Sequence, residues 1–300
     1  GGEVNNMSGN AVQTEVKYHS AKAARRRGLI IRYALMLIFV IPMILPVLWL
    51  LSTALKDNQA VFAMPPQWIP QTFHWDNFTI GLSRINFWHA FGNTLFIAVI
   101  CVCGTVISNL MVGYALSRFR FKGRKIWFYM IIGSMMIPGM TTVMPMFRFW
   151  TAVGAYGTWL PMIIPAWLAS PFSTFLTRQF LSTIPKSYDE AAKIDGASNA
   201  QTLSRVIAPL CKPLMAYMAI SCFQGVWNDY MNPLLYVISK RDKWTLSLAV
   251  ARLSSGTYGA EWNLYMAADI MYFLPILILF FAFQDYFMEG LGSMTASGVK

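Results

Sequence analysis

Charged residues are scarce in this sequence. Only 12% of its 300 residues are Asp, Glu, Lys or Arg, whereas 56% are hydrophobic. A soluble domain of this length cannot bury so large an apolar fraction, so the composition excludes an ordinary soluble protein and indicates that a bilayer surrounds most of the chain. The net charge of +11 does not predict a nucleic-acid partner, because the basic residues form short clusters beside apolar runs.

The residue types that carry catalysis or bind metals are also few. The three histidines do not cluster, and the four cysteines lack metal-ligand spacing. A membrane enzyme needs acid/base or metal-binding side chains that converge on one site. Because such residues are few here, a membrane enzyme is the weakest interpretation of the sequence. No G-x-x-x-x-G-K phosphate loop occurs, so any ATP chemistry must come from another chain. We predict no catalytic residue, no metal and no cofactor on this chain.

Six apolar segments are long enough to cross a bilayer, since about 30 Å of hydrocarbon needs roughly 20 helical residues. They are 29–51, 89–116, 126–150, 159–180, 214–238 and 267–287. Prolines interrupt several of them, which membrane helices tolerate when neighbouring helices satisfy the freed backbone groups. We therefore predict an all-α integral membrane domain over 29–287, a partly disordered N-terminal tail at 1–28 and a C-terminal tail at 288–300.

The distribution of Lys and Arg predicts the orientation of these spans. Six basic residues lie at or before the start of the first span, and five lie between the second and third spans. The loop 52–88 has only two basic residues. Cytoplasmic loops carry the excess of positive charge, so both termini are predicted to be cytoplasmic. The loop 239–266 disagrees, because it carries four basic residues although six spans place it outside.

A polar stretch, SYDEAAKIDGASNAQTLSRVIAP at 187–209, separates the fourth and fifth predicted spans. Ser187 with Glu190, and Ser198 with Gln201, have the spacing of capping boxes. Gly196 lies between them and is suited to end the first helix in a left-handed conformation. The stretch therefore predicts a cytoplasmic helix–Gly–helix elbow, which is short for a catalytic domain but suited to insertion into a groove on a partner.

This elbow resembles the EAA loop of binding-protein-dependent ABC importer permeases. The family pattern is E-A-A, three residues, G, nine residues, then I-x-L-P. The matching residues are Glu190, Ala191, Ala192, Gly196 and Pro209, with Val206 and Ala208 in place of the isoleucine and leucine. IDGAS at 194–198, WNDYMNPL at 227–234 and the Gly-containing tail FMEGLGSMTASGVK are similar to the carbohydrate (maltose-type) branch.

The resemblance implies a permease subunit that passes a sugar or oligosaccharide, neutral or acidic, across the bacterial inner membrane. The implied partners are a second permease in a heterodimer, two copies of an ABC ATPase that bind ATP and Mg, an extracytoplasmic substrate-binding protein and membrane lipid. The elbow would dock on the ATPase, with Glu190 as a polar contact, Ala191 and Ala192 as a close-contact surface and Gly196 as the bend. The implied coupling residues are Glu190, Ala191, Ala192, Asp195, Gly196 and Pro209.

Polar residues in the fifth predicted span are candidates for the substrate pathway. They are Trp227, Asn228, Asp229 and Asn232. Ionisable groups at membrane depth usually face the bundle interior or a water-filled cavity, so contact with a sugar hydroxyl and a helix–helix hydrogen bond are both open. The alternative function is a gradient-driven secondary transporter that needs no ATPase. Such a protein would favour internal inverted repeats and paired broken helices, and neither stands out in the sequence.

Overall fold

The computed structural model describes residues 3–254 and 261–296, with side chains for 28–29, 31–254 and 261–284. These residues form helices and connecting turns, with no strand among them, which confirms the prediction of an all-α protein. The ends of the two predicted tails, 1–2 and 297–300, lie outside the described residues. The N-terminal helix begins at Glu3, within the stretch for which the sequence predicted a partly disordered tail.

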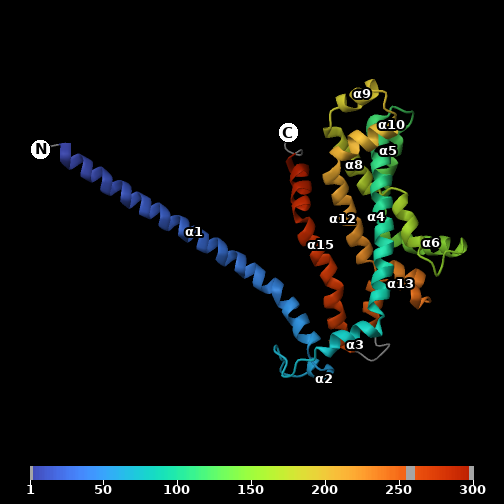
Figure 1. Ribbon diagram of the computed structural model, residues 1–300, viewed down its shortest axis with the longest axis horizontal. Coiled ribbons are helices and arrows are strands. Elements are labelled where there is room, and N and C mark those ends of the chain that lie inside the picture. Colours follow the sequence, from blue (N-terminus) through green and yellow to red (C-terminus); the bar gives the residue numbers. More distant parts are fainter. Residues whose placement is uncertain (1–2, 255–260, 297–300) are drawn as a thin grey trace.

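The chain forms the following helical segments, several of which are labelled in Figure 1. They are α1 (Glu3–Ala54), α2 (Asn58–Val61), α3 (Asp76–Arg84), α4 (Phe87–Arg118), α5 (Arg124–Ser134), α6 (Gly139–Ala152), α7 (Leu160–Ile163), η1 (Ile164–Trp167), α8 (Pro171–Thr183), α9 (Ser187–Ile194), α10 (Asn199–Gln201), η2 (Thr202–Ile207), α11 (Ala208–Leu210), α12 (Lys212–Trp227), α13 (Met231–Val237), η3 (Arg241–Lys243), α14 (Leu246–Ser254) and α15 (Trp262–Ala296).

Four helical stretches among the described residues are long and apolar enough to cross a membrane. They are Ile31–Ala54, Phe87–Arg118, Leu160–Thr183 and Trp262–Gln284. Two further candidates are bent pairs, α5 with α6 at 100° and Asn199–Leu210 with α12 at 83°. The described residues therefore contain four candidate spans, or up to six if each bent pair crosses the membrane as one span. The six spans predicted from the sequence equal this upper limit.

Three predicted spans are not continuous α-helices. The span predicted at 159–180 is interrupted between η1, which ends at Trp167, and α8, which begins at Pro171. The span predicted at 126–150 breaks between Ser134 and Gly139, where Pro138 has an extended backbone. A proline disfavours helical angles in the residue before it and removes a donor, which accounts for a break here. The span predicted at 214–238 ends as a helix at Trp227 and resumes at Met231. These breaks correct the prediction of continuous spans.

Helix α4 packs along both α12 and α8, and it runs the length of the bundle (Figure 1). Polar side chains inside it are paired within the bundle. The buried Asn109 donates to the Thr105 carbonyl at 2.7 Å and accepts from the Thr174 hydroxyl on α8 at 3.0 Å. Buried polar groups cost free energy unless they are hydrogen-bonded, so this pairing fixes how α4 and α8 pack.

Gly113 on α4 packs directly against Thr177 on α8, and we expect Gly113→Ala to destabilise the protein. A Cβ atom there would lie 2.4 Å from Cγ2 and 2.6 Å from Cβ of Thr177. The Thr177 Cβ cannot rotate away, so the helices must separate, at a cost of about 1–3 kcal/mol. Gly92→Ala is the matched control on the same helix, because nothing lies within 4 Å of its added Cβ. Thermal unfolding in detergent should show a lower midpoint for Gly113→Ala only; equal midpoints would contradict the packing.

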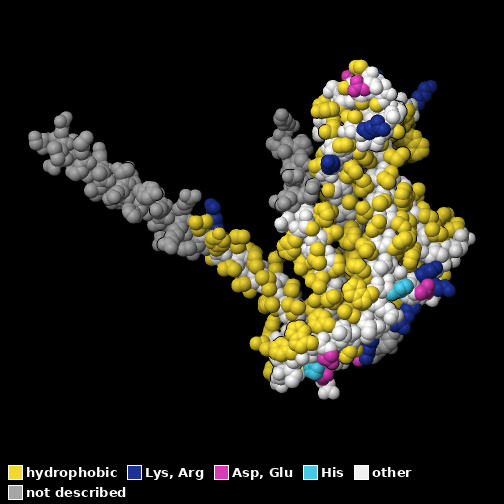
Figure 2. Space-filling model, viewed as in Figure 1, with side chains coloured by type: hydrophobic (Ala, Val, Ile, Leu, Met, Phe, Trp, Pro, Cys, Tyr) yellow, Lys and Arg dark blue, Asp and Glu magenta, His cyan; other side chains and the backbone are white. Residues whose placement is uncertain are grey.

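The two ends of the bundle differ in what they carry. The elbow end bears α9 and α10, and the far end bears α2 and α3 (Figure 1). The described part of the loop 239–266 lies at the far end, where the Asp242 carbonyl contacts His89 at 2.7 Å and Asn93 at 2.8 Å. The described residues of this loop thus lie at the end opposite the elbow, where six spans would place them, in spite of their basic side chains (Figure 2).

Candidate functional site

The turn between α9 and α10 has the helix–Gly–helix form. Gly196 has a φ of +78°, which is the left-handed region that glycine adopts without steric cost. Its N–H donates to the Lys193 carbonyl at 3.0 Å, and the Ala197 N–H donates to the Ala192 carbonyl at 2.9 Å. These two bonds make a Schellman motif, so the end of α9 is fixed by backbone hydrogen bonds.

One of the two predicted capping boxes is formed. The Ser198 hydroxyl accepts from the Gln201 backbone N–H at 3.3 Å, while the side-chain Oε1 of Gln201 accepts from the Ser198 backbone N–H at 2.8 Å. The box predicted at Ser187 is absent, because Lys186 already has helical backbone angles and Ser187 lies inside the first turn of α9. The elbow is therefore capped at its second helix and at its Schellman turn.

Most of the predicted coupling residues are exposed. The exposed ones are Glu190, Ala191, Asp195, Gly196 and Pro209. Ile194 is exposed to 87% and Tyr188 to 47%, so α9 also presents apolar surface at the elbow end. Ala192 departs from its predicted role in the contact surface, since it is only 7% exposed. It lies three residues from the buried Asp189 on the inward side of α9.

Asp189 is a site residue that the sequence did not suggest. Its carboxylate accepts from the Tyr114 hydroxyl at 2.9 Å and lies 3.1 Å from the Arg118 Nε. The Asp189 and Arg118 side chains are only 10% and 7% exposed. Tyr114 and Arg118 belong to α4, about seventy residues away along the chain, so no local pattern links them to the elbow. In the sequence, Arg118 is one of the five basic residues between the second and third predicted spans, which were used only to predict orientation.

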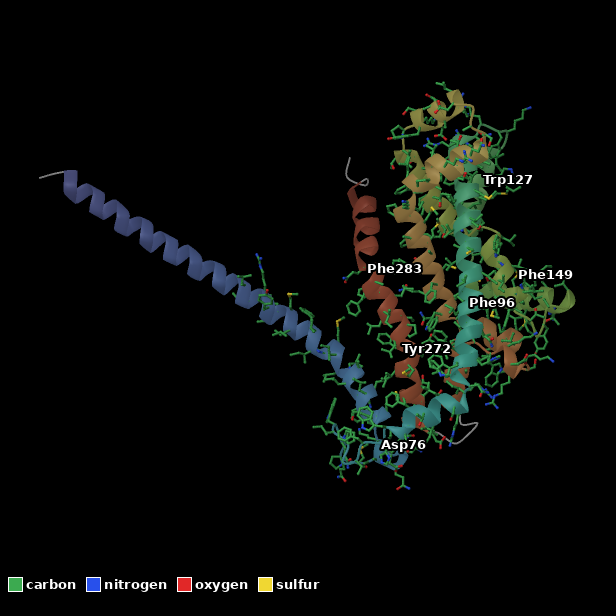
Figure 3. The ribbon with its side chains drawn as sticks, viewed as in Figure 1. Asp76, Phe96, Trp127, Phe149, Tyr272 and Phe283 are labelled. Carbon is green, nitrogen blue, oxygen red and sulfur yellow. The ribbon has the colours of Figure 1, made fainter. Side chains whose placement is uncertain are left out.

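The predicted pathway residue Trp227 lies in the core. It is 0% exposed, and its ring packs against Phe91, Phe223 and Tyr272 at centroid distances of 5.6, 5.3 and 6.0 Å. Its Nε1 donates to the Tyr272 carbonyl at 3.2 Å, and the Tyr272 hydroxyl donates back to the Trp227 carbonyl at 2.9 Å. Figure 3 shows Tyr272 on α15. Trp227 joins α12 to α15 and has no surface left for a substrate.

The other three pathway candidates lie at or beside the break between α12 and α13. The Asp229 carboxylate accepts from the backbone N–H and the side-chain amide of Asn232, at 3.1 and 2.8 Å. Asn228 accepts from the Tyr272 hydroxyl at 2.9 Å. Asn228 and Asn232 are exposed, and Asp229 is half-buried. These residues therefore form hydrogen bonds within the chain, and some of their polar atoms also remain accessible to a ligand.

The described residues do not provide a metal site. No three His, Cys, Asp or Glu side chains converge in that part of the chain. The site is thus an exposed elbow at one end of the bundle and a polar helix break towards the other.

Comparison with known proteins places the chain among membrane transport components. A family model described as the binding-protein-dependent transport system inner membrane component matches residues 109–292, more than half of the chain. The arabinooligosaccharides transport system permease protein AraQ of Halalkalibacterium halodurans is 34% identical over 232 residues, covering 77% of this chain and 81% of AraQ. The diacetylchitobiose uptake system permease protein NgcG of Streptomyces coelicolor is 28% identical and covers 88% of each chain.

The fold has a match among solved structures. A chain in the crystal structure of a bacterial ABC transporter involved in the import of the acidic polysaccharide alginate superposes with a TM-score of 0.75 at 24% identity, covering 87% of this chain and 97% of that one. At this identity the likeness shows the fold, and the matches of sequence show the family. This protein belongs to the binding-protein-dependent transport system inner membrane components, in agreement with the resemblance of its EAA loop.

Proposed function

We propose that this protein is the permease subunit of an ABC importer for a sugar or oligosaccharide, driven through the elbow at 187–209 by a separate ATPase. The observation that carries the proposal is the geometry of α9. Its two ends are fixed by hydrogen bonds and buried charge, whereas Tyr188, Glu190 and Ile194 are left exposed.

The exposed surface of α9 suits a groove on a partner protein. Ile194, exposed to 87%, is an apolar group at a polar tip, and burial in a partner would remove it from water. Glu190 adjoins this surface and offers a carboxylate for a charge-assisted contact. A short helix with apolar anchors inserted into a groove is a common recognition mode. ATP and Mg would be bound by the partner ATPase.

The proposed assembly follows the family. It consists of this chain, a second permease, two copies of the ATPase and an extracytoplasmic binding protein, in the bacterial inner membrane. Both termini and the elbow would face the cytoplasm, and the far end of the bundle would face the binding protein. The coupling residues in this proposal are Glu190, Ala191, Asp195, Gly196 and Pro209, while Ala192 packs inside the chain.

The polar break between α12 and α13 is the proposed substrate contact. Amide and carboxylate groups of Asn228, Asp229 and Asn232 can bind sugar hydroxyls, and non-helical backbone at membrane depth is tolerated where it lines a cavity. The Asp229 carboxylate would repel a uronate, so we propose a neutral oligosaccharide in preference to an acidic one.

Purification of the tagged chain from its native membranes in mild detergent tests this proposal. Mass spectrometry should identify a second permease and an ABC ATPase in the complex. Liposomes that contain the complex and its binding protein should take up labelled arabino-oligosaccharides only with internal ATP, and alginate oligosaccharides less well. A chain that purifies alone and transports these sugars along an ion gradient without ATP would establish the secondary transporter instead.

A further inference from the structure

We propose that Asp189 is a positioning residue that locks the elbow to the adjacent end of α4, so that α9 and α4 move as one body. This inference rests on the proposed function, because the movement in question is the one that the ATPase would impose on the elbow.

The contacts of Asp189 join the first turn of α9 to the last two turns of α4. One carboxylate oxygen accepts from Tyr114 at 2.9 Å, and the other lies 3.1 Å from the Arg118 Nε. The acidic side chain lies at a helix N-terminus and the basic one at a helix C-terminus, so both helix dipoles favour the pair. A charge buried to this degree without its partner is strongly destabilising, so the two helices cannot separate cheaply.

Arg118 also holds the segment that leads into the elbow. Its Nη2 donates to the Ile184 carbonyl at 2.8 Å, in the short turn between α8 and α9. On the other side, the second half of the elbow meets α12 at an 83° bend. The elbow is therefore connected to the bundle by a turn and a bend along the chain, and Asp189 connects α9 directly to α4 through Tyr114 and Arg118.

Helix α4 can carry a movement from the elbow end to the far end. Its 32 residues span about 48 Å. At the far end, the Asn93 amide donates to the carbonyls of Asp242 and Trp244 at 2.8 and 3.0 Å. The Thr94 hydroxyl accepts from the Leu246 N–H at 2.7 Å. A displacement of α9 would thus reach the loop that follows α13, through a continuous set of contacts.

Distances between spin labels test the lock directly. We would place labels at Lys193→Cys on α9 and Met111→Cys on α4, both exposed positions, in a background without the four native cysteines and in the complex with its co-purified ATPase. In the parent protein the distance should be narrowly distributed, and MgATP with vanadate should leave it unchanged. Asp189→Asn should make the distribution about twice as wide, because Arg118 loses its buried partner. Ser187→Ala, a change at an exposed position in the same turn of α9, should leave it narrow.

A narrow distribution in Asp189→Asn, or a shift of several ångströms in the parent protein on adding MgATP and vanadate, would overturn the proposal. Should Asp189→Asn fail to assemble, the double variant Arg118→Met with Asp189→Asn removes the unpaired charge. This double variant should assemble and still give a wide distribution of label distances. A narrow distribution would show that the pair of Arg118 with Asp189 serves only folding, and the proposal would be wrong. If no ATPase co-purifies with the parent chain, the proposed function fails. The widths of the distance distributions measured without nucleotide would still show whether Asp189 holds α9 to α4.

Discussion

Gly196→Pro should release the ATPase from the purified complex while the second permease stays bound. The native φ of +78° is inaccessible to proline, whose ring fixes φ near −65°. The substitution also removes the N–H that donates to the Lys193 carbonyl. The end of α9 must then rebuild, which displaces Ile194 and Glu190 together. The docking surface is then no longer preorganised for the ATPase, which weakens binding. Because about 1.4 kcal/mol corresponds to a tenfold change in affinity, we expect the amount of recovered ATPase to fall at least about tenfold.

Gly196→Ala is the graded control for that experiment. No atom lies within 4 Å of the added Cβ, so only the left-handed backbone is penalised, by about 1–2 kcal/mol. We expect recovery of the ATPase between those of the parent chain and Gly196→Pro, measured by quantitative mass spectrometry against the second permease. Equal recovery from all three proteins would show that this turn does not hold the docking surface.

Trp227→Ala should destabilise the bundle by about 3–5 kcal/mol, the range for deleting a buried aromatic side chain. The indole ring fills the space between α4, α12 and α15 and is fully buried. Its removal leaves a cavity and deprives the Tyr272 carbonyl of a donor. Thermal unfolding in detergent should show a large fall in the midpoint for this variant.

Trp227→Phe separates the packing of the ring from its hydrogen bond. Phenylalanine retains the stacking with Phe223 but cannot donate to Tyr272, so we expect a loss of about 1 kcal/mol. If Trp227→Ala kept the parent midpoint and lowered only sugar uptake, Trp227 would be a substrate contact and its assignment to the core would be wrong.

The fold class could be predicted because it depends on composition. An apolar fraction of 56% and few charges require a bilayer, and the bilayer thickness sets the helix length. The breaks could not be predicted in the same way. Pro42 and Pro46 lie inside α1 and Pro275 inside α15, yet the chain breaks before Pro138. Whether a proline ends a helix depends on the neighbours that satisfy the freed backbone groups, and the sequence does not show these.

The site was predictable where its contacts are local. The turn at Gly196 and the capping box of Ser198 with Gln201 join residues a few positions apart, so their spacing reveals them. The pairing of Asp189 with Tyr114 depends on how α9 docks on α4. Likewise, WNDYMNPL drew attention as a polar segment, but only packing shows that Trp227 points into the core while Asn228 is exposed.

The central claim, that the elbow docks on an ATPase, is tested most directly by site-specific photo-crosslinking in native membranes. A photoreactive residue at position 194 replaces an isoleucine that is 87% exposed at the tip of α9. The control at position 278 replaces an isoleucine that is 66% exposed on the apolar helix α15. We predict an adduct with an ABC ATPase from position 194 and none from position 278. An elbow that yields no ATPase adduct, or both positions yielding it equally, would contradict this account.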